Sequence, residues 1–434
     1  LFRSIAWERP VSAEWIQPED NGGFQIDCGL RIQGGGYIRS RYNYRSGSIP
    51  ESKYSFRLYF RGDYGEGRLR QAIFPEVPVD SFDTIVLRAG MNDATNPFLR
   101  DEFARQLEAD VGQVSARGTF VHLFLNGVYK GYYNPTERID VDFLRTWHGG
   151  ANDWDLMAMG GEIREGDAVA WNALRSYASA NNLALADKYL EIERRLDTTN
   201  FVEYLIPLIY ADTDDWPHNN WRAARERTPG SRYRFYAWDA EWSFGFANDV
   251  THNTIANQLS NLSPPWGGSE IQTLFLRLKA SPEFRLLFAD RVHKHFFNGG
   301  AMTDERLKAR YEWLKARIAP AISGFNNTIA TSWIPSRRRY LTNHFAQAGL
   351  LASSNAPVFN QFGGPVPRGF NLTLTNRLGT IHYTTNGADP RVRFSGAVAS
   401  DAFPYVPGTP IVIDSTMLVR ARSHLDALVA EIRR

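Results

Sequence analysis

A short acidic segment, DTDDWPHNN, gathers side chains that can hold a magnesium ion and accept a proton. It places Asp212, Asp214, Asp215, Asn219 and Asn220 next to one another in the chain. Carboxylate and amide oxygens are the protein ligands that Mg²⁺ prefers. Phosphoryl transfer needs such ligands, cations that hold the phosphates, and an oxygen that orients the attacking hydroxyl. The segment therefore indicates metal-assisted phosphoryl transfer as the chemistry to test.

The spacing inside this segment favours particular residues. Asp215 and Asn220 are five positions apart, like the catalytic aspartate and the metal-binding asparagine of protein kinases. Asp214 and Asn219 have the same spacing, so two registers remain open. A second motif, WDAEWSFG, places Asp239 at the end of an aromatic strand, where a kinase has its second metal-binding aspartate. Taken alone, DTDDWPHNN is more simply an Asx-turn loop, and WDAEWSFG has an ordinary strand end as its alternative. The two motifs together, in this order after a β-rich half, favour the kinase interpretation.

The phosphates would also need a cation. Only seven of the 49 basic residues are lysines, and Lys53 opens the third predicted strand, KYSFRLYF. Lys53 is the candidate for contacting the phosphates, and Arg57 on the same strand is its alternative. Asp101 and Glu102, on a helix predicted to begin at Asn96-Pro97, are candidates to pair with that cation.

Other candidates for nucleotide binding flank this strand. The glycine triplet centred on Gly35 would let the backbone approach phosphates, and Arg39 and Arg41 follow it. Glu137 lies where the β-rich part passes into the helical part, in the place of a kinase hinge. A helix-start carboxylate is the alternative interpretation of Glu137.

The elements that must position these residues follow a recognisable order. Alternating apolar runs predict strands in the first ninety residues, and Asn126-Gly127 predicts a hairpin after the helix. Helical patterns follow over 138–210 and 268–346, separated by the two acidic motifs. We predict an α+β, protein-kinase-like domain over 1–345, with a β-rich N-lobe to about 137 and a helical C-lobe over 138–345. A linker over 346–368 then leads to a small all-β sandwich module over 369–434.

The composition of the chain and the motifs that it lacks exclude several classes of function. The net charge of +2 argues against a surface that wraps nucleic acid, and no apolar run is long enough for a transmembrane segment. Cys28 is the one cysteine, which excludes an internal disulfide and a cysteine-based metal cluster. The sequence has no GxSxG, HExxH or Walker A motif. A glycosidase with paired carboxylates stays open as an alternative.

Several collinear stretches resemble the spore-coat CotH kinase family over about residues 8–250. They are RPVSAEWIQPEDNGGFQIDCGLRIQGGG, KYSFRLYFRGDYGEGRL, LRDEFARQL, VHLFLNGVYKGYYNPTERID, DDWPHNNW and YAWDAEWSFG. The resemblance implies an atypical kinase that binds ATP and Mg²⁺ and phosphorylates protein hydroxyls. It makes Asp215 the catalytic aspartate, Asn220 and Asp239 the metal ligands, and Lys53 the cation on the phosphates.

The tail resembles a second family, the chitobiase/hexosaminidase C-terminal module, through GTIHYTTNGADPR and TPIVIDSTMLVRARS. Asn386 stands where that module usually has aspartate. The resemblance implies a non-catalytic β-sandwich that contacts glycan or serves as a spacer. Both families imply a secreted or cell-surface protein, and the chain starts at Leu1 without a signal segment.

These observations lead to two functional hypotheses. The first is an ATP- and Mg²⁺-dependent atypical kinase that phosphorylates Ser or Thr hydroxyls of an exported or surface protein. The second is a catalytically silent, kinase-like component of an extracellular coat or envelope, whose β module makes glycan or protein contacts.

Overall fold

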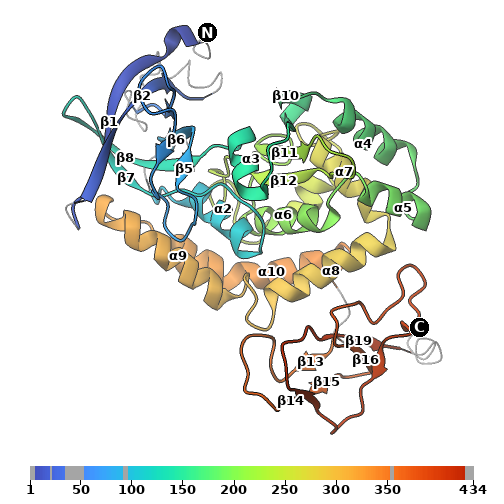
Figure 1. The fold of residues 1–434 in the computed structure, drawn as a ribbon. Coiled ribbons are helices and arrows are strands. Elements are labelled where there is room, and N and C mark those ends of the chain that lie inside the picture. Colours follow the sequence, from blue (N-terminus) through green and yellow to red (C-terminus); the bar gives the residue numbers. More distant parts are fainter. Residues whose placement is uncertain (1–4, 20–21, 35–52, 91–95, 352–355, 426–434) are drawn as a thin grey trace.

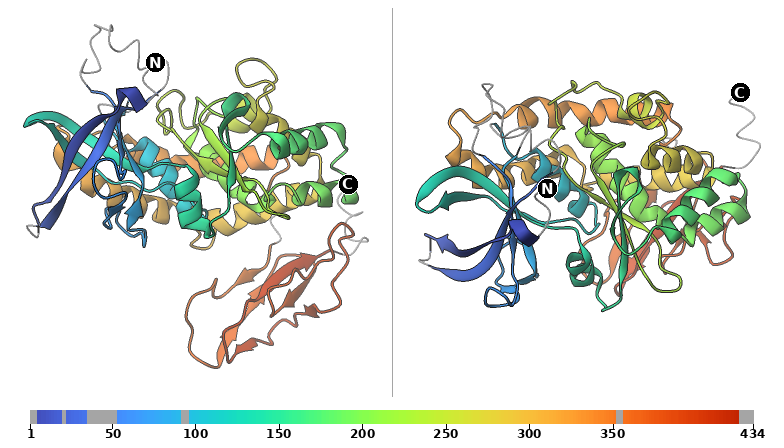
Figure 2. Two further views of the ribbon diagram at one scale, coloured as in Figure 1. Left: turned by 45° about the horizontal axis from the view of Figure 1, so that its top comes forward. Right: turned by 90° about the horizontal axis from the view of Figure 1, so that it is seen from above.

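The chain forms a mixed α/β structure with two sheets, a helical half and a separate group of short strands. The computed structural model describes residues 5–19, 22–34, 53–90, 96–351 and 356–425 (Figures 1 and 2). Gly35, Arg39 and Arg41 lie outside the described residues.

A curled antiparallel sheet of six strands forms the N-terminal half, in the order β1-β2-β3-β6-β8-β7. Asn126 and Gly127 both have positive φ, at 50° and 78°, which fits the tight turn predicted between β7 and β8. One face of the sheet buries a core that includes Cys28, Phe56 and Ile85. The strands are β1 (Arg9–Gln17), β2 (Gly22–Ile32), β3 (Phe56–Tyr59), β6 (Thr84–Arg88), β7 (Val121–Leu125) and β8 (Val128–Glu137), and a separate short pair is β4 (Leu69–Arg70) and β5 (Ser81–Phe82).

The helix between β6 and β7 differs from its prediction at the N-terminus. Helix α2 spans Arg100–Asp110, and its N-cap residue is Leu99 rather than Asn96. The Asn96 side chain instead bonds to the segment after α9, donating to Gly324 O at 2.8 Å and accepting from Asn326 N at 2.6 Å. The Asn-Pro signal therefore marks a tertiary contact and not the helix cap.

The second sheet corrects the prediction of a purely helical region over 138–210. Its four strands lie in the order β10-β9-β11-β12, and two of them fall inside that region. The segment WDLMA is buried at every position, so its sequence lacks the alternation that marks a half-exposed strand. The strands are β9 (Trp154–Ala158), β10 (Glu162–Glu165), β11 (Trp221–Glu226) and β12 (Arg234–Ala237).

Helices surround this second sheet and form the largest core. The central helix is α6 (Thr198–Ala211), whose first turn is capped by the Asp197 side chain accepting from Asn200 N at 3.1 Å. Its buried residues pack on β12, α2 and α8. The other helices are α3 (Val141–His148), α4 (Val169–Ala180), α5 (Ala186–Glu193), α7 (Glu270–Lys279), α8 (Pro282–Phe296), α9 (Asp304–Ile318) and α10 (Ile334–Gln347).

Short strands form the C-terminal part, beyond α8 in Figure 1. Its small core centres on Leu372, Leu374, Ile381 and Tyr405. Arg422 links it to α8 through Asp290 at 2.6 Å. The strands are β13 (Val358–Phe359), β14 (Phe370–Leu372), β15 (Leu374–Thr375), β16 (Thr380–Thr384), β17 (Phe403–Pro404), β18 (Ile411–Ile413) and β19 (Arg420–His424).

Across the described ranges, none of the helices combines the length and the apolar character that a bilayer crossing requires.

A buried carboxylate joins the two halves of the structure. Glu108, on α2, is fully buried, and both of its side-chain oxygens accept from Ala237 N of β12 at 3.0 Å. Burial raises the pKa of Glu108 to about 8, although Ser115, Ala237 and nearby arginines act in the opposite direction. The junction between α2 and the second sheet is therefore sensitive to proton loss.

This pKa predicts a pH-dependent stability. The folded chain holds the Glu108 proton more tightly than the unfolded chain, whose pKa is near 4.5. The stabilisation from this proton is complete below that value and is lost as pH rises through 8, with a slope of at most about 1.4 kcal/mol per pH unit. Urea denaturation of Glu108→Gln between pH 5 and 8 should show a flatter free energy of unfolding than wild type. Parallel curves would contradict the prediction, and the exposed Glu305→Gln variant is the charge-matched control.

Candidate active site

The two acidic motifs meet at one end of the β11–β12 pair. Trp221 pairs with Ala237, so Asn220 and Trp238 are neighbours just beyond the last pair, and Asp239 follows. The loop after α6 is fixed to the same segment, because Asp214 N donates to Trp242 O at 2.8 Å. The fold therefore brings the loop with Asp215 and Asn220 to the segment that carries Asp239.

The Asp215 side chain is the centre of its own hydrogen-bond network. Asn219 Nδ2 donates to Oδ1 at 2.6 Å, and Asn220 Nδ2 donates to Oδ2 at 3.1 Å. His218 Nε2 lies 3.3 Å from Oδ1. Burial raises the pKa of the Asp215 carboxyl, but the hydrogen bonds from these neighbours outweigh burial and hold the pKa below its usual value. Asp215 is thus an oriented, ionised carboxylate at neutral pH.

The neighbouring aspartates have other partners. Asp214 Oδ1 accepts from Asn248 Nδ2 at 3.1 Å, whereas neither Asn219 nor Asn220 bonds to it in the structure. Asp212, the αL residue that ends α6, is buried and accepts from Thr254 Oγ1 at 2.5 Å. Both asparagines of the motif therefore contact Asp215, the aspartate of the first register.

Arg88, the last residue of β6, is the cation at this site that the sequence analysis did not single out. It is 8% exposed and contacts three carboxylates. Its Nη2 donates to Asp239 Oδ1 at 2.6 Å and to Glu241 Oε1 at 3.0 Å, and its Nε lies 3.1 Å from Asp101 Oδ2. Burial lowers the pKa of Arg88, but the three carboxylates outweigh it and raise the pKa above its usual range. The sequence signal was available, since Arg88 ends the strand directly before the helix that carries Asp101.

Helix α2 is locked to the Asp239 segment by this pairing. Asp101 accepts from Ala240 N at 2.7 Å and from Arg105 Nε at 3.1 Å. Arg105 is completely buried and also donates to Glu102 Oε2 at 2.7 Å. Asp101 and Glu102 were expected to pair with a cation. In the structure, Asp101 pairs with Arg88 and Arg105, and Glu102 pairs with Arg105.

Among the contacts of the Asp239 carboxylate described above, Lys53 does not appear. Strand β3 begins at Phe56, so Lys53 precedes the strand instead of opening it. Lys53 is 6% exposed, and its Nζ lies 4.3 Å from the ring centre of Phe98 and 4.4 Å from that of Tyr132. This arrangement is a cation–π contact. Its proposed contact with phosphate stays a prediction.

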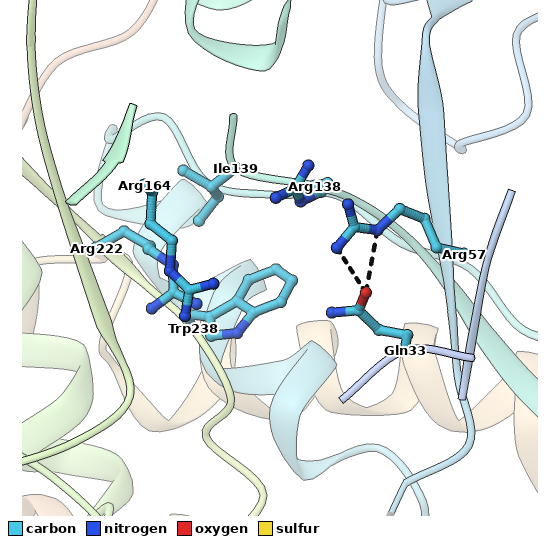
Figure 3. Close-up of a pocket in the computed structure, with 7 residues that line it drawn as sticks. All are labelled: Gln33, Arg57, Arg138, Ile139, Arg164, Arg222 and Trp238. Carbon is cyan, nitrogen blue, oxygen red and sulfur yellow. Dashed lines mark hydrogen bonds between the residues drawn. The ribbon is translucent and has the colours of Figure 1, made fainter. Parts of the chain in front are cut away.

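Glu137 ends β8, at the passage between the two sheets. Its carboxylate accepts from Arg117 N and Trp147 Nε1, each at 3.0 Å, and it is buried. Burial raises the pKa of Glu137 to about 7 in spite of these two bonds. The side chain is therefore held by the protein itself, while the next residue, Arg138, lines a pocket between the sheets (Figure 3).

The donor set at Asp239 fits a magnesium ion. The Asp239 side chain is 42% exposed, and its second oxygen, Oδ2, has no hydrogen-bond partner among the described residues. No group of three or more His, Cys, Asp or Glu side chains forms a metal cluster in the described part of the chain. Mg²⁺ commonly uses one or two protein oxygens and completes its shell with phosphates and water. Asp239, with the amide oxygen of Asn220, is a set of that kind.

The Arg88 network predicts a large loss of stability when its cation is removed. Arg88→Met leaves buried carboxylates without their shared counter-charge, which should lower the free energy of unfolding by about 3–5 kcal/mol. Arg88→Lys should lose less, because it keeps the charge but not the forked geometry. Urea denaturation measures both. The control Arg194→Met breaks an exposed pair with Glu191 and should change stability by less than about 1 kcal/mol; an equal loss in both Met variants would contradict the network's importance.

Comparison with known proteins assigns the chain to a family. Among curated proteins, none matches the chain. A similar solved structure is that of the Helicobacter pylori proinflammatory kinase CtkA, with 12% identity and a TM-score of 0.24 over 66% of this chain and 96% of that one. The family model described as CotH kinase protein matches residues 30–328, which is more than half of the chain and includes Arg88, Asp215, Asn220 and Asp239. The chain belongs to the CotH kinase family.

Proposed function

We propose that the chain is an ATP- and Mg²⁺-dependent atypical protein kinase that phosphorylates Ser or Thr hydroxyls. The observation that carries the proposal is the meeting of an oriented Asp215 with Asn220 and Asp239 at one end of β11–β12. Membership of the CotH kinase family supports the same reaction class.

Each residue has a definable role in that reaction. Asp215 accepts a hydrogen bond from the acceptor hydroxyl, orients its oxygen toward the phosphorus and takes its proton. Asp239 and Asn220 would hold Mg²⁺, which supplies charge neutralisation on the phosphates. Arg88 is a positioning residue, since it fixes one oxygen of Asp239 and leaves the other available. The ordering of these groups before substrate binds is what lowers the barrier.

The acceptor in this proposal is an exported or surface protein, and the kinase itself is secreted or held at the cell surface. The near-neutral charge of +2 fits a protein acceptor better than a polyanionic one. The family resemblance to spore-coat kinases supports this location.

Substitution of the two aspartates tests the reaction directly. In an assay with γ-labelled ATP, Mg²⁺ and the chain itself or secreted proteins as acceptors, Asp215→Asn and Asp239→Asn should each lower the transfer rate by at least about 100-fold. Both variants should keep the wild-type circular dichroism spectrum. Asp153→Asn, which alters a carboxylate that is 81% exposed and remote in its contacts from the motif, is the matched control and should keep wild-type activity.

The same assay separates the enzyme from a silent, kinase-like coat or envelope component. If wild type neither binds ATP nor transfers phosphate to any acceptor, the kinase proposal is wrong. If transfer persists in Asp215→Asn and Asp239→Asn at the wild-type rate, the assignment of these residues is wrong.

We propose further that the C-terminal strands form a chitobiase-type module that contacts glycan. An apolar groove there is lined by Phe359, Phe362, Phe370 and Met417. Phe362 is 44% exposed, so its ring is accessible for stacking against a sugar face. A groove of this kind supports ligand contact more than a spacer role.

A pelleting assay on insoluble chitin and peptidoglycan tests this module. The wild-type chain should sediment with at least one of these glycans, and Phe362→Ala should reduce the bound fraction several-fold because it removes the exposed ring. Val406→Ala, which shortens another exposed apolar side chain of the same part, should bind like wild type. Absence of binding would leave the spacer role as the explanation, and equal binding by all three proteins would contradict the role of Phe362 in the contact.

A further inference from the structure

One buried arginine on α10 contacts both of the segments that are joined to the candidate active site. Arg337 is completely buried, and α10 packs against α6 (Figure 1). Helix α6 leads directly into the loop that carries Asp215, and the segment 250–254 follows the motif that carries Asp239. Arg337 therefore lies where these two parts of the chain meet the helical core.

The guanidinium of Arg337 donates to both segments at once. Its Nε donates to Tyr210 O at 3.2 Å and its Nη2 to Ile209 O at 3.1 Å, both in the last turn of α6. Its Nη1 donates to Val250 O at 2.8 Å and to His252 O at 2.6 Å. A cation is favourable at the C-terminal end of a helix, where carbonyl oxygens lack partners within the helix. The side chain thus ties the end of α6 to the segment 250–254.

The hydroxyl of Thr254 extends this contact to the first residue after α6. Thr254 Oγ1 accepts from Arg337 Nη2 at 3.0 Å and donates to Asp212 Oδ1 at 2.5 Å. His252 Nδ1 lies 2.8 Å from the same oxygen of Asp212. Asp212 has a φ of 53°, a left-handed conformation that a residue other than glycine keeps only where its surroundings hold it. The buried chain from Arg337 through Thr254 to Asp212 provides that hold.

Backbone hydrogen bonds continue the connection along the loop. Phe244 N donates to Ala211 O at 2.7 Å, and Asp214 N donates to Trp242 O at 2.8 Å. The chain from the end of α6 to Asp214 is therefore fixed at several points, and Asp215 follows immediately. The position of the Asp215 carboxylate depends on the anchoring that begins at α10.

The two functional residues of the loop are held by different parts of the fold. Asp215 follows the end that Arg337 fixes, whereas Asn220 directly precedes β11 and is held by the pairing of β11 with β12. A change at Arg337 should therefore displace the carboxylate that orients the acceptor hydroxyl more than the residues proposed to hold the metal. A displacement of about 1 Å can lower a reaction rate by about 100-fold.

We propose that Arg337 and Thr254 are positioning residues for Asp215. Both are completely buried, so they act through the loop and not on a substrate. Arg337 holds the end of α6 to the segment 250–254, and Thr254 connects that contact to Asp212. The inference rests on the proposed function for the role of Asp215, but the connection itself does not depend on phosphate transfer.

Steady-state kinetics of two substitutions at Thr254, in the full chain, test this role. Thr254→Val removes the hydroxyl and keeps a side chain of similar shape. It should lower kcat about tenfold, with KM for ATP within about twofold of wild type, because the metal-holding residues stay in place. Thr254→Ser keeps the hydroxyl and should have a kcat within about twofold of wild type. A wild-type kcat in Thr254→Val, or equal losses in both variants, would overturn the proposal.

A matched pair of substitutions on α10 tests the arginine itself. Arg337→Lys keeps the charge but loses the forked donors, and should lower kcat about tenfold or more. Arg338, the next residue on the helix, pairs with Asp304 at 3.0 Å and is 37% exposed, so Arg338→Lys should keep the wild-type kcat. Equal kcat values in these two variants would contradict the proposal. If Arg337→Lys does not fold, the two Thr254 variants decide the outcome.

Hydrogen exchange measured by mass spectrometry gives a readout that is independent of activity. In Thr254→Val, the amides of residues 211–216 should exchange about tenfold faster than in wild type and in Thr254→Ser, while those of β11 and β12 should not change. Unchanged exchange at 211–216 would overturn the proposal. If wild type transfers no phosphate, the proposed function is wrong, and this comparison still decides whether Thr254 and Arg337 hold the loop.

Discussion

The buried guanidinium of Arg88 is the constraint on which the candidate active site depends. A charge that is 8% exposed is stable only with counter-charges at short range, and the fold supplies them from separate segments. Asp101 comes from α2, while Asp239 and Glu241 follow β12. One side chain therefore fixes the helix, the first sheet and the Asp239 segment relative to one another. Glu108 adds a second link between α2 and β12 through Ala237 N.

The region between the two sheets has one acidic end and one basic end. Asp215 and Asp239 lie at the end of β11–β12, and both have side chains that are about 40% exposed. Arg222 lies in β11 and lines a pocket together with Arg57, Arg138 and Arg164. Trp238 stands in that pocket and precedes Asp239 in the chain, so the backbone passes directly from one end to the other. A ligand that carries phosphates and binds a metal is complementary to such a region.

Local spacing predicted the parts of the site that lie within one loop. Asp215 and Asn220 could be found because a five-residue separation is visible in the sequence, and the Asn126-Gly127 hairpin because its turn has a strong local preference. Lys53 was chosen because lysine is rare in this chain; the structure places its ammonium group beside aromatic rings, and its contact with phosphate stays a prediction. Arg88, which contacts Asp239, was not found because its partners come from distant parts of the sequence. The four arginines of the pocket come from separate elements, so no local sequence pattern indicates that they meet. Strand β9 is buried at every position, so its sequence does not alternate between apolar and polar residues.

In the proposed reaction, Asp239 and Asn220, held in place through Arg88 and the β11–β12 pair, would hold the metal ion at one end of the phosphotransfer site. The most direct measurement is the anomalous diffraction of crystals grown with Mn²⁺ and a non-hydrolysable ATP analogue. We predict an anomalous peak within coordination distance of an Asp239 carboxylate oxygen and of the Asn220 amide oxygen, with Arg88 still bonded to Asp239. A peak bound elsewhere, or no peak at Asp239 in crystals that contain the nucleotide, would contradict it.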